Sequence, residues 1–298
     1  MRRTGNVGPP DACQRQMRLF YDPNDLPHAK KLHDERLTWL QELGAARLDQ
    51  AKPDDAGFFF GYQHGVEQLR EALARFPNIR DRPEEREELL RLDCILQRLN
   101  DHGIEVPTPR TWILRIDEQP PPDLEFPLFV RTPTSSWKRG GEQSKVQSLK
   151  QLDDEVELLR RAFGWDVPIL ARQWLNLAVA GSWMFGKAPQ EIRVWLVDKV
   201  PVAWSFHYLH AVPNPKGFPP SNADLRHLAE LAERIADPFQ SRLIVADFVR
   251  DRKGRWHFLE AGPGAVAGTA HQSVFKHIAR RLMGETTIME SDAVGGRF

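Results

Sequence analysis

The stretch Leu243-Ile244-Val245-Ala246-Asp247-Phe248-Val249, followed by Asp251-Arg252-Lys253-Gly254 and by Trp256 to Glu260, predicts a β-hairpin. Its first run is apolar on both sides, which is typical of a strand that is covered on two faces. A turn centred between Lys253 and Gly254 places Asp247 directly opposite Glu260. Residues opposite each other in a hairpin share a face, with Cβ atoms about 4.5–5.5 Å apart. The hairpin therefore predicts two facing carboxylates.

This carboxylate pair predicts a site for a hard cation. Two carboxylates in an apolar hairpin repel each other and lose hydration, so they require compensation. Mg²⁺ can supply it, because oxygen ligands and substrate phosphates complete its shell. The alternative is that Asp247 pairs with an arginine and Glu260 merely ends a strand. The hairpin alone favours neither, and a slip of one residue in the register would separate the pair.

Hydrophobic periodicity over the rest of the chain predicts an α+β protein. Before residue 103 the pattern is mostly helical, with 57–60 as the one expected buried strand. Hairpins dominate the later part. Further strands are predicted at 111–116, 128–131, 145–148, 169–175, 192–197 and 202–210. Helices are predicted at 27–43, 64–76, 84–100, 149–163, 223–236 and 271–283.

The composition excludes several classes of protein. The 298 residues include 41 Lys+Arg and 41 Asp+Glu, a balance that argues against a general polyanion binder. A hydrophobic content of 41% with nine Trp excludes global disorder. The two cysteines, Cys13 and Cys94, form no disulfide framework or metal-ligand spacing, which predicts a reduced, cytoplasmic protein. The most apolar stretch, 169–185, contains Arg172, Gln173 and Asn176, so no membrane span is predicted.

Several segments, read in order between residues 84 and 283, resemble the ATP-grasp superfamily. Leu-Asn-Asp-His-Gly-Ile-Glu-Val-Pro-Thr at 99–108 is similar to the segment that leads into the nucleotide-binding subdomain. The later matches are the strand 126–131 that ends at a phosphate-binding residue, the Gly-rich loop 135–141, the hinge strand 169–175, the strand 191–194 with its arginine, and the metal-binding hairpin at Asp247-Phe248 and Leu259-Glu260.

The resemblance implies a set of site residues. Arg131 stands where lysine is usual, and together with Lys138 and Lys145 it resembles the clade named for one arginine and two lysines. Phosphate contacts are implied for Arg131, Lys138, Lys145 and Arg193, of which Lys138 and Arg193 are the implied catalytic residues; adenine contacts are implied for Gln173, Trp174 and Leu175; metal ligation is implied for Asp247 and Glu260.

Several of these residues also have an ordinary structural explanation. Arg131 could be a surface arginine, and Lys138 could belong to a solvated loop. Arg193 could lie on a solvent-exposed face with Glu191 as an intrastrand partner, and Trp174 could be core. In one respect the chain departs from the family, because Gly262 replaces the usual third metal ligand, an asparagine. The N-terminal third also shows no alternating strands of the usual preceding α/β domain.

The implied architecture is an ATP-grasp fold, in which two α+β subdomains, 104–175 and 176–298, grip ATP. A mostly helical region, 1–103, precedes them in the sequence. The implied activity is that of an ATP- and Mg²⁺-dependent ligase that joins a small-molecule or peptide carboxylate to an amine through an acyl phosphate. One alternative is a non-catalytic ATP-binding regulatory module, which Gly262 would mark. Another is ATP-dependent modification of a nucleic-acid end, because 30 of the 41 basic residues are Arg, although zero net charge argues against nucleic acid as a partner.

Overall fold

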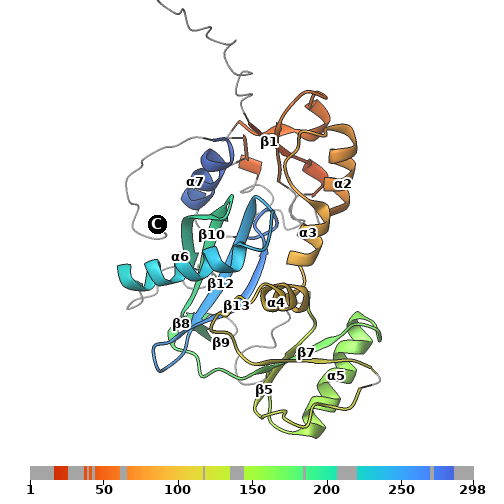
Figure 1. The fold of residues 1–298 in the computed structure, drawn as a ribbon, viewed down its shortest axis with the longest axis vertical. Helices are drawn as coiled ribbons and strands as arrows, with labels where there is room; N and C mark the ends of the chain where they lie inside the picture. Colours follow the sequence, from red (N-terminus) through yellow and green to blue (C-terminus); the bar gives the residue numbers. More distant parts are fainter. Residues whose placement is uncertain are drawn as a thin grey trace, which may run out of the picture.

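The structure is a computed structural model that describes residues 17–25, 37–38, 40–41, 44–60, 66–116, 118–134, 144–183, 186–206, 220–268 and 272–284. Figure 1 shows a central sheet with helices on both faces, a second sheet with one long helix at one end, and a small N-terminal sheet at the other end. The predicted α+β class is confirmed. Among the described residues, no helix has the length and apolar character that crossing a membrane would require.

The central sheet is antiparallel, with the strand order β11-β10-β12-β13. One face packs on α6 and the other on α7, so the strands are covered on both sides as their apolar runs predict. A capping box formed by Ser221 and Asp224 begins α6. The elements are β10 (Glu191–Val197), β11 (Val200–Phe206), α6 (Asn222–Ala236), β12 (Leu243–Arg250), β13 (Trp256–Pro263) and α7 (Gln272–Leu282).

The hairpin β12–β13 confirms the predicted pairing of Asp247 with Glu260, although its turn differs from the prediction. Arg250 pairs with Trp256, so the turn centres on Lys253 and not between Lys253 and Gly254. Continued without interruption, that register would put Leu259 opposite Asp247. A β-bulge at Leu259 shifts the register by one residue and brings Glu260 opposite Asp247.

Asp251 holds the turn of this hairpin together. Its side chain accepts hydrogen bonds from the backbone N–H groups of Lys253 and Arg255, both at 2.9 Å, and from the Arg255 side chain at 2.9 Å. His257 Nε2 lies 3.1 Å from the same carboxylate. Burial alone would raise the pKa of Asp251, but the Arg255 backbone N–H, His257 and the Arg255 guanidinium hold that pKa well below its usual range.

We expect Asp251→Asn to destabilise the protein at pH 7 and to lose this effect in acid. The pKa of Asp251 is lower in the folded state than the value of about 3.9 in an unfolded chain. As the pH falls below about 4, the unfolded state therefore binds more protons than the folded state, and the stabilisation by Asp251 is lost. The difference in urea midpoint between wild type and variant should therefore shrink from pH 5 to pH 2. The control is Asp237→Asn, which removes an exposed carboxylate that pairs with Lys199. A difference that stays constant over this range would contradict the assignment.

The second sheet has the order β4-β7-β5-β6 and is also antiparallel. Helix α5 covers it through Leu152 and Leu159. Its elements lie at or near the predicted positions: β4 (Thr111–Leu114), β5 (Leu128–Arg131), β6 (Lys145–Val146), α5 (Leu149–Phe163) and β7 (Ile169–Gln173). The following hairpin, β8 (Val179–Trp183) with β9 (Gly186–Pro189), was not predicted.

The N-terminal region differs from the sequence-based prediction in two respects. The strand at 57–60 is β3 (Gly57–Phe59), but it belongs to a parallel three-stranded sheet of the order β2-β1-β3, so the expectation of one buried strand and no alternating strands is wrong. The helix predicted at 84–100 is two helices. Of the helix predicted at 27–43, the described residues 37–38 and 40–41 are helical and the others lie outside the described residues. The elements are β1 (Arg18–Tyr21), a 3₁₀ turn (Pro23–Asp25), β2 (Ala46–Arg47), a second 3₁₀ turn (Leu48–Gln50), α2 (Val66–Arg75), α3 (Pro83–Leu89) and α4 (Leu92–Asp101).

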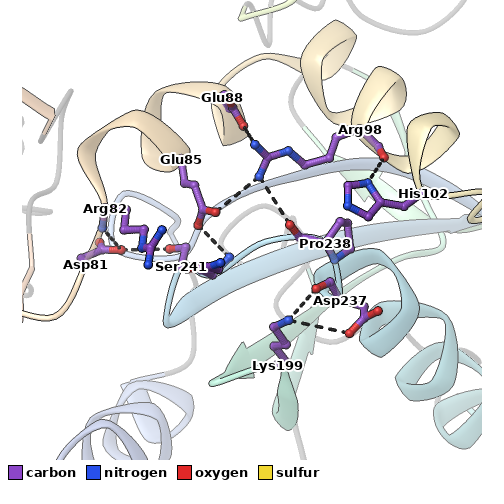
Figure 2. Close-up of polar contacts among 11 residues, drawn as sticks. Asp81, Arg82, Glu85, Glu88, Arg98, His102, Lys199, Asp237, Pro238 and Ser241 are labelled. Atoms are coloured by element: carbon purple, nitrogen blue, oxygen red, sulfur yellow. Dashed lines mark hydrogen bonds and ion pairs between the residues drawn. The ribbon is translucent and has the colours of Figure 1, made fainter.

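Polar contacts join α3 and α4 to the segment between α6 and β12 (Figure 2). Glu85 accepts a hydrogen bond from Arg98 at 3.3 Å and one from the Gln240 backbone N–H at 2.7 Å. Ser241 donates to Asp81 at 3.0 Å. Apolar side chains of α3 and α4 belong to the same core as the central sheet. The N-terminal region is therefore anchored on the sheet that carries the carboxylate pair.

Candidate active site

Three charged side chains form a row across the central sheet. Arg193 on β10 lies opposite Asp247 on β12, and Asp247 lies opposite Glu260 on β13. Directly opposed residues of antiparallel strands share a face, so all three project toward the side that α7 partly covers. Asp247 is only 1% exposed. The ladder register thus places one cation and two carboxylates side by side on a largely buried surface.

Arg193 holds Asp247 in a bidentate ion pair. Its Nε lies 2.7 Å from Oδ1 and its Nη2 lies 2.6 Å from Oδ2, and its Nη1 donates to the Gly268 carbonyl at 2.8 Å. Burial would lower the pKa of Arg193, but the Asp247 carboxylate raises it above its usual value, with smaller contributions from Glu260 and Glu191. The arginine therefore stays charged although it is buried. The alternative considered for Asp247, pairing with an arginine, is what this structure contains.

Glu260 is held by an arginine from the other sheet. Arg131, the last residue of β5, lies 2.5 Å from Glu260 through Nη1 and donates from Nε to the Thr132 carbonyl at 3.1 Å. Arg131 is 8% exposed, so the explanation as an ordinary surface arginine is wrong. The ion pair brings the end of β5 against β13. Two predicted phosphate-binding arginines and two predicted metal-binding carboxylates therefore form one cluster.

Arg172 belongs to this cluster, although it was not among the site residues predicted from the sequence. It is 3% exposed on β7, and its Nη1 donates to the Leu259 carbonyl at 2.7 Å. Burial, with the charge of Arg131 next in importance, lowers its pKa to about 9, while Glu260 opposes that shift. The signal in the sequence was a single arginine that directly follows the apolar run Ile169-Leu170-Ala171 near the end of a predicted strand.

The other predicted contacts lie around the end of β7. The Lys145 Nζ lies 5.7 Å from the centre of the Trp174 ring, which joins a predicted phosphate contact to a predicted adenine contact. The backbone N–H of Gln173 donates to the Arg110 carbonyl at 2.8 Å, and that of Trp174 donates to the Pro127 carbonyl at 3.0 Å. Leu175 directly follows and is half-buried. Lys138 lies outside the described residues, so its predicted role stays a prediction.

The carboxylate pair fits a hard divalent cation in ligand type. Asp247 and Glu260 supply oxygen atoms from opposed positions, and Mg²⁺ in proteins is often held by one or two carboxylates together with substrate phosphates. Within the described part of the chain, no group of three or more His, Cys, Asp or Glu could hold a metal ion. At Gly262 an added Cβ would come no nearer than 3.8 Å to Val245, so the position has room for a Cβ, but the glycine supplies no ligand. Phosphate oxygens and water would complete the shell.

Comparisons with solved structures show the same fold in three proteins. An ATP-grasp RimK domain protein from Sphaerobacter thermophilus matches with a TM-score of 0.56 at 13% identity, covering 89% of this chain and 97% of its own. D-alanine–D-alanine ligase from Bacillus anthracis, in complex with ATP, matches with 0.58 at 14% identity, covering 90% and 99%. N5-carboxyaminoimidazole synthase from Aspergillus clavatus, in complex with ADP and 5-aminoimidazole ribonucleotide, matches with a TM-score of 0.56 at 12% identity, covering 92% of this chain and 78% of its own.

Sequence comparison gives the family. A search of curated proteins found no match. The family model described as "ATP-grasp domain, R2K clade family 3" matches residues 127–282, which is more than half of the chain and includes Arg131, Arg172, Arg193, Asp247 and Glu260. The resemblance inferred from the order of the motifs is confirmed at the level of the superfamily and of the clade. The chain belongs to the ATP-grasp proteins of R2K clade family 3.

Proposed function

We propose that this protein is an ATP-dependent ligase that activates a carboxylate as an acyl phosphate and joins it to an amine. Membership in the ATP-grasp family supports ATP as the substrate. Two proteins with the same fold are named as a ligase and a synthase, and their structures contain ATP or ADP. The partners we propose are small-molecule or peptide carboxylates and amines, in the reduced cytoplasm.

In this proposal ATP lies between the two sheets. Residues 104–175 form the nucleotide-binding subdomain, 176–298 the metal-binding subdomain, and 1–103 a region that supports both. The end of β7 at Gln173, Trp174 and Leu175 receives adenine. Arg131, Lys145 and Arg193 contact the phosphates from the two sheets, and Lys138 does so from the segment between β5 and β6.

The observation that carries this proposal is the pair of ion pairs, Arg131–Glu260 and Arg193–Asp247. Each joins a cation suited to bidentate phosphate contact to a carboxylate suited to a hard cation. When a nucleotide enters, each arginine can transfer from its carboxylate to phosphate oxygens, and each carboxylate then becomes a ligand. Asp247 and Glu260 would hold Mg²⁺, which when bound would neutralise the charge of the phosphates.

The chemistry then requires positioning more than protein nucleophiles. A carboxylate oxygen of the substrate attacks the γ-phosphorus in line, the bond to the ADP oxygen breaks, and ADP leaves. The amine next attacks the acyl carbon, the bond to phosphate breaks, and the amine nitrogen gives up a proton. Arg193 and Lys138 contribute by stabilising the negative charge on the transferred group.

One observation favours a second candidate, a non-catalytic nucleotide-binding module. Both carboxylates are already neutralised by arginines, and Gly262 offers no third ligand at the place of the usual asparagine. Such a module would bind ATP without hydrolysing it.

Release of ADP and phosphate distinguishes the two candidates. We expect the purified protein, given ATP, Mg²⁺ and a panel of amino acids and short peptides, to release both products only when a suitable carboxylate is present. Mass spectrometry of the reaction should show a product with the combined mass of acid and amine less one water. ATP binding without release of ADP across the whole panel would contradict the ligase and support the module.

A further inference from the structure

The bulge in β13 determines where Glu260 points. Beyond the turn, Phe258 pairs with Phe248, and both side chains lie in the core on the α6 side of the sheet. An uninterrupted register would pair Glu260 with Ala246 and turn its carboxylate toward that apolar core. The extra residue, Leu259, places Glu260 on the opposite face, beside Asp247. The two facing carboxylates therefore depend on a local irregularity of the strand.

A bulge of this kind needs partners for the backbone groups that the ladder no longer pairs, and Arg172 supplies one. Its Nη1 donates to the carbonyl of Leu259, the extra residue itself, at 2.7 Å. A hydrogen bond from a charged donor is stronger than one between neutral groups. Because Arg172 is 3% exposed, water competes little for that carbonyl.

The rest of the Arg172 side chain ties the bulge to its surroundings. Its Nη2 donates to the Thr108 hydroxyl at 3.2 Å, and that hydroxyl donates to the Phe258 carbonyl at 3.0 Å. The Phe258 N–H in turn donates to the Pro107 carbonyl at 2.6 Å. The Nε of Arg172 donates to Thr111 on β4 at 3.1 Å. One guanidinium thus connects β7, β4, the segment at 107–108 and the bulge.

We infer that Arg172 is a positioning residue that holds the β13 bulge so that Glu260 faces Asp247. This inference rests on the proposed function, because it concerns the carboxylate that would hold the metal. Arg131 touches the Glu260 carboxylate directly, whereas Arg172 acts on the backbone immediately before it. Arg172 consequently controls the separation of the two carboxylates without contacting substrate or metal.

Metal binding tests this role directly. We expect Arg172→Met to weaken Mn²⁺ binding in the presence of a non-hydrolysable ATP analogue by about 10–100-fold, the usual effect of removing a residue that orients a ligand. Mn²⁺ stands in for Mg²⁺ because electron paramagnetic resonance reports it without turnover. Binding of the analogue in EDTA should change by less than about threefold. The control is Arg110→Met, which removes an exposed arginine directly before β4 of the same sheet.

A second measurement needs neither nucleotide nor metal. In the protein alone, Arg172→Met should accelerate amide hydrogen exchange in a peptide spanning residues 257–262, while a peptide from α6 keeps the wild-type rate. If Arg172→Met does not fold, Arg172→Lys serves in both experiments, because it keeps the charge but loses the three-way fork.

The outcomes separate the role of Arg172 from the proposed function. Unchanged Mn²⁺ binding by the variant would overturn the positioning role, and so would an equal loss of analogue binding in EDTA, which would make Arg172 a phosphate contact. Unchanged exchange at 257–262 would overturn it as well. A wild-type protein that binds the analogue no more tightly with Mn²⁺ than without would overturn the proposed function itself, while the exchange experiment would still report on the bulge.

Discussion

Asp247→Asn is expected to reduce ATP turnover by about 100–1000-fold, the range found when one preorganised charge-stabilising group is removed from an active site. The substitution keeps the size of the side chain, and its amide oxygen can still accept one hydrogen bond from Arg193. It removes the negative charge that a cation would require, and it deprives the charge of Arg193 of its main compensating carboxylate in a site where Asp247 is 1% exposed. ADP release at saturating ATP measures the effect.

Asp251→Asn is the matched control for this prediction. Asp251 is also a buried carboxylate of the β12–β13 hairpin, and it also accepts several hydrogen bonds, but it lies at the turn. We expect this variant to lower stability while its turnover in the folded state stays within about threefold of wild type. An Asp247→Asn protein that is folded by circular dichroism and turns over ATP at the wild-type rate would refute the assignment of Asp247 to the metal.

The pairing of Asp247 with Glu260 could be predicted because alternation in a hairpin restricts which residues can meet. The prediction was right about the pair and wrong about the turn, since the turn is centred half a residue earlier than predicted and the bulge at Leu259 shifts the register back by the same amount. A bulge inside an apolar strand leaves no clear mark in hydrophobic periodicity. Alternation also placed Arg193 on the face opposite to Ile192 and Val194. Its ion pair with Asp247 additionally requires that β10 and β12 are neighbours in the sheet, which the sequence did not reveal.

Arg172 could not be assigned because its partners are distant in sequence. The Leu259 carbonyl lies 87 residues away and the Thr108 hydroxyl 64 residues away. The N-terminal strands escaped for a different reason. Strand β1 has four residues and β2 has two, which is too few for alternation of apolar and polar residues to appear. These segments become strands by pairing in parallel within the sheet β2-β1-β3, and a pattern within each segment does not reveal that pairing.

The division of the helix predicted at 84–100 has a similar cause. Apolar spacing continues from Leu89 through Leu92, but Arg91 has extended backbone angles, φ −120° and ψ 110°. The Leu92 N–H donates to the Pro133 carbonyl at 3.2 Å, just after β5. A contact with another part of the chain thus interrupts a pattern that local propensity would have continued.

Arg86→Met is expected to lower the free energy of unfolding by about 3–5 kcal/mol, the usual cost of removing one partner of a buried ion pair. Arg86 is 0% exposed and pairs with Asp81, whose side chain is 1% exposed. It also donates to the Phe59 carbonyl at the end of β3, at 3.1 Å. Its loss leaves the Asp81 carboxylate buried with a net charge, as well as a carbonyl without this donor. Urea denaturation followed by tryptophan fluorescence measures the change.

The double variant Arg86→Met with Asp81→Asn separates the unpaired charge from lost packing. The amide oxygen introduced by Asp81→Asn can still accept from Ser241 and from the Arg82 N–H, the bonds of Oδ1 in Figure 2, so removing the charge should recover at least about 1 kcal/mol. Arg70→Met, which removes an exposed arginine, should cost less than about 1 kcal/mol. A double variant no more stable than Arg86→Met would show that the guanidinium acts through packing. Recovery would show that this anchor of the N-terminal region on the central sheet depends on charge compensation.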